Sequence, residues 1–298
     1  MIRTRSAMGA LILWTGISCL ARGTTVSAAG APAGKGPAHP FFALCHDTHD
    51  AKRRTLEQQA VLLAELGYDG AGHLWLDHVT ERLETLDRHG LRLFQIYVRV
   101  SLDPSKPKYD PRLADILPKL KGRDVVLGVL ITGMPPSSPA GDSRAVAILR
   151  EMADLAEPAG VRLAIYPHHR DWTERVADAV RVARKVDRTN VGVMFNLCHW
   201  LRAEKGRDPR PALESAMPHL FVVTINGADG EGEWDRLIQP LGSGSFDVCG
   251  LLATLGELGY TGPIGLQCYG IAGDVRDTLE RSMKAWREYS ATFARSRR

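Results

Sequence analysis

Histidine, asparagine, glutamine and tyrosine recur directly after short apolar runs of this sequence, and carboxylates are scarce at the same places. Five of these residues are histidines, whose imidazole takes up or releases a proton near neutral pH. One such histidine is more often a hydrogen-bonded structural residue than a catalyst, but five together favour a functional group. They are His46, His73, His168, His169 and His199.

Neutral donors and acceptors dominate the rest of this set and indicate a ligand rich in hydroxyl groups, because amides and imidazoles pair with a sugar without adding charge. Trp75, Trp172, Trp200 and Trp234 lie in or near the same segments and could cover the C–H face of such a ligand. We expect at least half of them to pack helices onto a core instead. The predicted substrate-binding residues are His46, His73, Arg99, His169, Asn196, Asn226, Gln267 and Trp200.

The apolar runs that precede these residues have the length of strands, and each is followed by an amphipathic stretch, with about 30 residues per unit. Their regular alternation along the chain indicates parallel strands joined by crossover helices. The eight predicted strands are 41–45, 69–74, 91–98, 125–131, 161–165, 191–195, 220–225 and 264–266.

Between the strands, apolar residues recur at three- and four-residue spacing, which is typical of a helix packed on one face. The predicted helices are 56–66, 79–86, 113–120, 146–155, 176–186, 251–258 and 283–289. Glycine stands just before the next strand in several units, and this position suits a left-handed helix end. These glycines are Gly67, Gly90, Gly122, Gly160 and Gly259.

Eight such units predict an α/β fold with a single (β/α)8 TIM barrel over residues 40–294. An open, doubly wound sheet would carry a glycine-rich turn after its first strand, but residues 46–50 there read HDTHD. In a barrel, chemistry takes place at the carboxyl ends of the strands. The polar residues described above lie at those ends.

Residues 1–28 are predicted to be a secretory signal peptide, with a basic start, an apolar run over 7–20 and small residues before Ala28. We expect cleavage after Ala28 or Ala29, a linker over 29–39, and an exported protein, periplasmic or extracellular, without a membrane span after cleavage. An uncleaved anchor is the alternative, but the apolar run is short for a span. Lipoprotein anchoring through Cys19 is not expected, because Gly16 stands where a lipobox has a large aliphatic residue.

The formal charge of +4 comes from the two ends of the chain, because residues 1–28 and a basic tail at 295–298 each hold three arginines and no acid. A near-neutral remainder argues against nucleic acid or anionic lipid as a partner. Four cysteines follow residue 28, and their spacing fits no zinc motif. We expect buried free thiols, although an oxidising compartment permits a disulfide. They are Cys45, Cys198, Cys249 and Cys268.

Several segments resemble motifs of the xylose isomerase-like TIM barrels, a family of sugar isomerases and epimerases that includes metal-dependent abasic-site endonucleases. VRLAIYPHH at 161–169 resembles its strand-five motif, and NVGVMFNLCHW at 190–200 resembles its D-x-x-H motif. HLFVVTING at 219–227, and PLGSGSFD at 240–247 followed by LGYTGPIGLQ at 258–267, resemble the segments that end in its last ligands. The resemblance covers most of the chain after the leader.

In that family two glutamates, an aspartate and a histidine hold a divalent metal, and the carboxylates move a proton next to a carbonyl. The matching positions here are Tyr166, Asn196, Thr224 and Gln267. Mg²⁺ and Mn²⁺ prefer carboxylates, and an amide accepts no proton at neutral pH. The resemblance therefore implies the fold without the family mechanism, and we expect no metal cofactor.

Two residues of the family motifs remain, because His168 matches the histidine of the strand-five motif and His199 that of D-x-x-H. We interpret them as a general acid and base pair, and Tyr166 as a further candidate acid unless its ring only fills the space of the metal and its glutamate. A softer metal, zinc or another divalent ion, is the alternative use of the histidines. Its ligands would be His46, His168, His169 and His199, with Cys198 nearby.

We therefore expect an exported carbohydrate-active enzyme of the isomerase or epimerase type, which transfers a proton at a carbon next to the carbonyl of a sugar or keto-sugar. A non-catalytic carbohydrate-binding barrel is one alternative, and a lyase or hydratase acting on oxidised (keto) glycosides is another. A nuclease is rejected because it needs metal ligands and a basic groove for phosphates. The expected partner is a small-molecule carbohydrate, with no nucleic acid.

Overall fold

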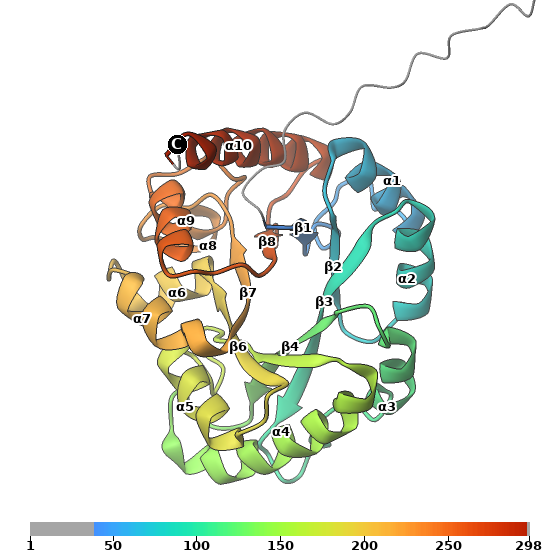
Figure 1. Ribbon diagram of the computed structural model, residues 1–298, viewed down its shortest axis with the longest axis vertical. Helices are drawn as coiled ribbons and strands as arrows, with labels where there is room; N and C mark the ends of the chain where they lie inside the picture. Colours follow the sequence, from blue (N-terminus) through green and yellow to red (C-terminus); the bar gives the residue numbers. More distant parts are fainter. Residues whose placement is uncertain (1–38, 297–298) are drawn as a thin grey trace, which may run out of the picture. The chain divides into compact units, whose positions relative to one another are not determined.

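Eight parallel strands close into a barrel in the computed structural model, which describes residues 39–296 (Figure 1). Each strand pairs with its neighbours in the chain, and β1 closes the ring against β8 from Phe41↔Ile264 to Leu44↔Gln267. The predicted single (β/α)8 barrel is confirmed. The strands are β1 (Phe41–Leu44), β2 (Gly70–Leu74), β3 (Arg92–Ser101), β4 (Val126–Thr132), β5 (Arg162–Ile165), β6 (Val191–Asn196), β7 (Leu220–Ile225) and β8 (Ile264–Gln267).

Helices surround the barrel (Figure 1). They are α1 (Leu56–Leu66), α2 (Val79–Arg88), α3 (Leu113–Ile116), α4 (Asp142–Ala156), α5 (Val176–Val186), α6 (Leu197–Glu204), α7 (Arg210–Ala216), α8 (Trp234–Leu237), α9 (Val248–Glu257) and α10 (Val275–Ser296). Short 3-10 turns lie at η1 (Leu117–Leu120), η2 (Pro139–Gly141), η3 (Glu157–Ala159) and η4 (Met217–His219). Within residues 39–296, no helix is both long and apolar enough to cross a membrane.

The predicted signal peptide, the linker and the basic tail lie largely outside the residues that the structure describes. The signal peptide at 1–28 and the linker up to residue 38 lie outside the described residues, as do the last two residues of the basic tail. Helix α10 continues to Ser296 and so includes the first two residues of that tail.

The helix ends follow the sequence closely. All five glycines that were expected to end helices in the left-handed region have φ values between 65° and 83°. Helix α1 begins at a capping box, in which the Thr55 side chain accepts from the Gln58 N–H and the Gln58 side chain accepts from the Thr55 N–H. Local capping thus fixes where this helix starts and where the chain turns back to the next strand.

Aromatic side chains fill the interior of the barrel. Phe42 stacks on Phe94 with ring centroids 4.9 Å apart, and Tyr97 lies against Tyr166 at the same separation. Facing glycines give these rings their space. A Cβ at Gly265 would lie 2.6 Å from Phe42 Cζ, and one at Gly128 would lie 2.6 Å from Tyr97 Cδ1. We call these four rings the aromatic plug, and the pocket described below begins beside it.

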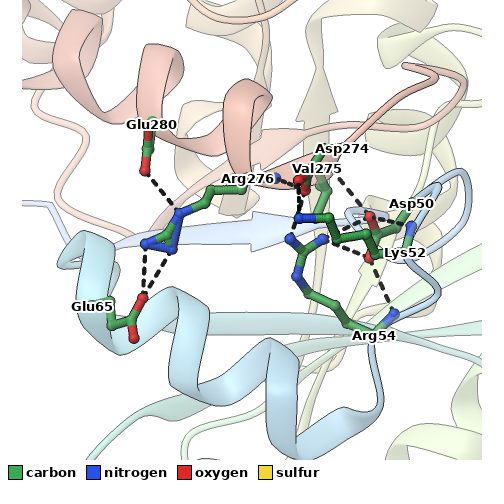
Figure 2. A network of polar contacts seen from close by, with 8 residues as sticks. All are labelled: Asp50, Lys52, Arg54, Glu65, Asp274, Val275, Arg276 and Glu280. Carbon is green, nitrogen blue, oxygen red and sulfur yellow. Dashed lines mark hydrogen bonds and ion pairs between the residues drawn. The ribbon is translucent and has the colours of Figure 1, made fainter.

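A polar clasp holds the first and last βα units together where the ring closes (Figure 2). Asp50 accepts hydrogen bonds from the backbone N–H groups of Lys52, Arg54 and Val275. The Arg54 guanidinium bridges Asp50 and Asp274, at 2.7 and 2.6 Å. The loop after β1 is therefore tied to the start of α10. Beside the clasp, Arg276 pairs with Glu65 of α1 and Glu280 of α10.

A cluster of polar side chains is buried between the first two βα units, on the side of the strands that faces the helices. Its centre is Arg82, a fully buried residue of α2. Arg82 donates to Gln59 Oε1 at 2.6 Å and to His73 Nδ1 at 3.4 Å, and lies 3.6 Å from Asp47 Oδ2. His46 is buried beside this group, and neither of its ring nitrogens has a hydrogen-bond partner among the described residues. Burial lowers the pKa of His46 to about 4.

We predict that the buried imidazole of His46 makes the folded state sensitive to acid. Its folded pKa of about 4 lies below the ordinary value of 6.5, so the unfolded chain binds more protons between these two values. The stabilisation is fully present above pH 6.5 and falls as the pH drops toward 4, by about 3 kcal/mol in all. Urea unfolding of the wild type and His46→Gln at pH 7 and pH 4.5 measures this loss.

The wild type should lose about 2 kcal/mol more unfolding free energy over this interval than His46→Gln, which cannot titrate. Carboxylates that respond to acid affect both proteins equally. The same pH dependence in both proteins would contradict the assignment.

Candidate functional site

A pocket of about 500 Å³ opens at the carboxyl ends of the strands, beside the aromatic plug. We call it the central pocket. Five predicted site residues line it, namely Arg99, Tyr166, His168, His199 and Gln267. Its remaining wall is formed by Cys45, Leu74, Trp75, Tyr97, Leu130, Trp234, Asp235, Ile238, Tyr269 and Gly270.

Two imidazoles face each other at this pocket. The rings of His168 and His199 lie 4.0 Å apart between centroids and are tilted by 40°. His168 Nδ1 lies 3.3 Å from Asp171 Oδ2, whereas His199 Nδ1 accepts a hydrogen bond from the backbone N–H of His169 at 3.2 Å. The acceptor role of His199 Nδ1 places the ring hydrogen of a neutral His199 on Nε2. The two rings thus have different neighbours at Nδ1.

The charge state of His199 follows from its surroundings. Burial lowers its pKa well below 6.5, and the nearby His168 and His169 lower it further. His199 is therefore a neutral imidazole at physiological pH, with an N–H to donate. A neutral imidazole can polarise a carbonyl by donating this N–H to the carbonyl oxygen.

Asn196 joins three parts of this site through one amide. It is the last residue of β6 and the N-cap of α6, where Oδ1 accepts from the backbone N–H of His199 at 3.1 Å. The same oxygen accepts from Cys198 Sγ, and Nδ2 donates to the Tyr166 hydroxyl at 3.0 Å. The turn from strand to helix therefore places His199 and fixes the orientation of Tyr166.

Two tyrosines bring buried hydroxyls to the same place. Tyr166 presents its ring edge to both His168 and His199, each at 5.5 Å between centroids. Burial raises the pKa of Tyr97 and of Tyr166 well above 10, so both hydroxyls keep their hydrogen. The Tyr97 hydroxyl is buried beside that of Tyr166, with no other polar partner in residues 39–296. Tyr97 is a site residue that the sequence interpretation missed.

The wall beside Tyr97 is longer than the sequence indicated. Strand β3 continues to Ser101, so Arg99, expected just after a strand that ends at residue 98, lies within it. Tyr97 and Arg99 are two residues apart and point to the same side of the strand. The Arg99 guanidinium covers the Trp75 ring at 4.7 Å from its centroid.

The four candidate stacking tryptophans divide equally. Trp75 and Trp234 line the central pocket, and Trp234 lies 5.3 Å from His199 between ring centroids. Trp172 and Trp200 are buried in the hydrophobic core. Trp200, a predicted substrate-binding residue, packs 6.2 Å from Phe195 between centroids and does not line the pocket.

His46 and His73 were grouped with the other histidines, but the structure places them in the buried polar group around Arg82. Along β2 the side chains alternate, so His73, next to the pocket-lining Leu74, points toward the helical layer. Cys45 follows β1 in a left-handed conformation with φ 55°, which ends the strand alternation, so Cys45 lines the pocket while His46 lies beside Arg82. The hydrophobic pattern of the sequence shows where a strand ends more reliably than it shows whether a residue there faces the pocket or the helices.

Two more predicted binding residues act through other contacts. Asn226 is buried, and its Nδ2 donates to the carbonyls of Gly227 and Leu237, which holds the segment before α8. His169 gives its backbone N–H to His199, while its own Nδ1 lies 2.9 Å from Glu174. Both residues shape the site without lining the central pocket.

The sequence interpretation also missed Asp171, the partner of His168. The two stand three residues apart in the loop after β5, and their side chains lie close together. A carboxylate at this spacing from a candidate catalytic histidine was the available signal, because a partner at Nδ1 orients the imidazole.

The positions that hold the family metal carry side chains engaged with other groups. Asn196 binds Tyr166, Cys198 and His199, as described above. Thr224 donates to the Phe195 carbonyl, and Gln267 Oε1 accepts from the Tyr269 N–H. None of these groups carries the charge that offsets a dication. In the part of the chain described, no three His, Cys, Asp or Glu side chains form a group that could hold a metal ion. These residues do not fit a divalent metal.

The four cysteines of the described chain are free thiols. Cys45, Cys198 and Cys268 are buried, as expected, whereas Cys249 is partly exposed. Burial raises the pKa of Cys198 to about 12 and that of Cys45 well above its ordinary value. Neither thiol at the pocket is a thiolate nucleophile near neutral pH.

Comparison with known proteins gives two curated relatives. A ketose 3-epimerase of Arthrobacter globiformis is 25% identical over 182 residues, which are 59% of this chain and 59% of that protein. A 3-dehydroshikimate dehydratase of Pseudomonas aeruginosa is 28% identical over 129 residues, 41% of this chain and 20% of that protein. The chain thus spans less than two thirds of the length of either relative.

A solved structure, the IolI protein with a binding zinc atom, shares the fold. It superposes with a TM-score of 0.65 at 17% identity, over 85% of this chain and 99% of that chain. At this identity the likeness concerns the fold alone.

A family model gives the assignment. The model described as xylose isomerase-like TIM barrel matches residues 60–289, which include seven of the eight strands and the histidine pair. The chain belongs to the xylose isomerase-like TIM barrel family.

Proposed function

We propose that the protein transfers a proton at the carbon next to the carbonyl of a sugar or keto-sugar, as an epimerase or isomerase. The observation that carries this proposal is the pair of imidazoles in the central pocket, with different neighbours at Nδ1. The curated relatives, a ketose 3-epimerase and a 3-dehydroshikimate dehydratase, support the reaction class.

His168 is the base in this proposal. Asp171 lies at its Nδ1 and orients the ring, which leaves Nε2 to take the proton from carbon. His199 donates its Nε2–H to the carbonyl oxygen and stabilises the negative charge that develops there. Its neutral state suits this role, because the N–H is present throughout the physiological pH range.

A proton is then delivered to the planar intermediate. Delivery to the same carbon from the opposite face by a second donor inverts the centre, after which His168 releases its proton to solvent and the second donor takes one up. Delivery of the His168 proton to the neighbouring carbon, with transfer of a hydroxyl proton from one oxygen to the other, isomerises the sugar. Tyr166 lies at the floor of the pocket with its hydroxyl protonated, and we assign it as the second proton donor. A substrate that already carries a keto group suits this site, because its C–H bond is acidic without a metal.

A lyase is the second candidate, and the dehydratase relative favours it. Removal of water from a β-hydroxy carbonyl compound begins with the same loss of a proton. The two reactions separate afterwards, because elimination expels hydroxide and leaves a conjugated product that absorbs ultraviolet light. Epimerisation and isomerisation leave the mass and the absorbance unchanged.

We predict that His168→Ala and His199→Ala each lower turnover by a factor of about 10²–10⁴, since each removes a group that acts on the proton or the oxygen in the transition state. Exchange of solvent deuterium into ketoses, followed by NMR, measures the rate. Sugar binding, followed by calorimetry, should change far less than the rate.

His78→Ala is the matched control, because this histidine is exposed at the start of α2, away from the central pocket. It should keep the wild-type rate. If the two pocket variants weaken binding and no sugar shows exchange even with the wild type, the barrel binds carbohydrate without catalysis.

We also predict that a metal chelator leaves the exchange rate within about twofold of the untreated protein, because the side chains at the family metal positions are uncharged and engaged in hydrogen bonds within the protein. Dialysis against the chelator, with metal analysis before and after, makes the measurement. Stoichiometric manganese or zinc whose removal abolishes exchange would contradict the proposed mechanism.

We propose, finally, that the protein is exported, on the strength of the basic start, the apolar run over 7–20 and the small residues before Ala28. The mature protein should begin at Ala29 or Gly30. N-terminal sequencing of protein recovered from the cell envelope and medium tests this. An intact Met1 on protein outside the cytoplasm would point to an uncleaved anchor instead.

A further inference from the structure

A second hollow adjoins the central pocket, and the two share Trp75, Tyr97 and Arg99 as lining. We call it the side cleft. It has a volume of about 910 Å³, and the ends of β3 and β4 contribute Ser101 and Thr132 to it. Because three residues belong to both hollows, one ligand can reach from the central pocket into the side cleft.

The residue assigned as the base lies where the two hollows meet. His168 lines the central pocket, and its partner Asp171 lines the side cleft. The Tyr97 side chain lines both hollows, and its buried hydroxyl lies beside that of Tyr166 with no other polar partner among the described residues. A buried hydroxyl with spare hydrogen-bonding capacity is stabilised when a ligand or water pairs with it. A polar atom of a ligand at the junction would meet this donor.

The junction is a built surface rather than a gap between loops. Trp75 takes a left-handed conformation, with φ 66°, which is rare for a tryptophan and costs backbone strain. Its ring is covered by the Arg99 guanidinium at 4.7 Å from the centroid. Arg99 has no carboxylate partner in residues 39–296, so its N–H groups are open to a ligand.

The side cleft is polar, but its charges largely balance one another. Arg112 pairs with Asp77 at 2.7 Å and with Asp110 at 2.6 Å. Tyr109 adds an aromatic face, and its hydroxyl donates to Glu151 at 2.6 Å, which holds the ring in place. The side cleft is lined by three cations and three carboxylates, so its net charge is zero, and this balance together with the Tyr109 ring suits a neutral second sugar unit better than a phosphate, which favours a net positive lining.

We propose that the side cleft binds the second unit of a glycoside, so that the substrate is a keto-sugar linked through oxygen to another sugar. The keto-sugar occupies the central pocket, the linking oxygen lies beside Tyr97, and the second sugar rests against Tyr109. The placing of the keto-sugar depends on the proposed function, whereas the binding of two linked units does not.

The test compares D-fructose with two disaccharides that contain it with a free keto group, lactulose and turanose. Calorimetry gives Kd, and solvent deuterium exchange gives kcat/KM, for the wild type, Tyr109→Ala and Tyr109→Phe. At least one disaccharide should bind the wild type about tenfold more tightly than D-fructose, the effect expected of one stacked ring and its hydrogen bonds. Tyr109→Ala should remove most of that preference.

Tyr109→Phe is the matched control, because it keeps the ring and loses only the bond to Glu151. It should retain most of the preference, which a general loss of folding would not allow. Equal Kd values for D-fructose and both disaccharides in the wild type overturn the proposal. So does a preference that survives Tyr109→Ala.

The two proposals fail in different ways. Exchange with D-fructose and no preference for either disaccharide removes the side cleft as a subsite and leaves the proposed function intact. Preferential binding of a disaccharide without exchange of any sugar supports the side cleft and removes the proposed catalysis. Absence of both binding and exchange overturns both.

Discussion

The Asn196 amide is the contact on which the site depends, because it satisfies three groups from different parts of the fold without adding charge. Its oxygen caps α6 and accepts from Cys198, and its nitrogen holds Tyr166. A carboxylate here would be a buried anion, and without a metal beside it that anion would be costly. The amide lets the interior end of the barrel stay neutral.

Because Asn196 is uncharged, the protonation of the two histidines depends on their other neighbours. Two imidazoles with centroids 4.0 Å apart resist double protonation, because each cation raises the cost of the other. Burial and this neighbour both keep His199 uncharged, whereas His168 has Asp171 3.3 Å from its Nδ1. The two identical side chains therefore differ in their surroundings, which is what the proposed roles of donor and base require.

Much of this fold could be predicted from the sequence, because period, length and glycine placement act locally. The eight strands and the left-handed helix ends follow directly from them. Helices α6 to α8 were not expected, since their segments are short and lack a clear apolar stripe. His46 and His73 were predicted to bind substrate because they lie near strand ends, but neither lines the central pocket, since the face that a residue takes there depends on the local backbone, as the left-handed Cys45 shows.

The same interior packing determines where the ligand can lie. The aromatic plug fills the barrel, so a ligand lies beyond it, at the rim formed by the carboxyl ends of the strands. That rim is uneven, since β3 has ten residues and β4 has seven, whereas β1, β5 and β8 have four each. The two long strands remain paired as far as Ser101↔Thr132. The extended part of these strands carries residues that line the side cleft, among them Arg99 and Ser101. The open surface therefore runs from the histidine pair in the central pocket along β3 and β4 into the side cleft.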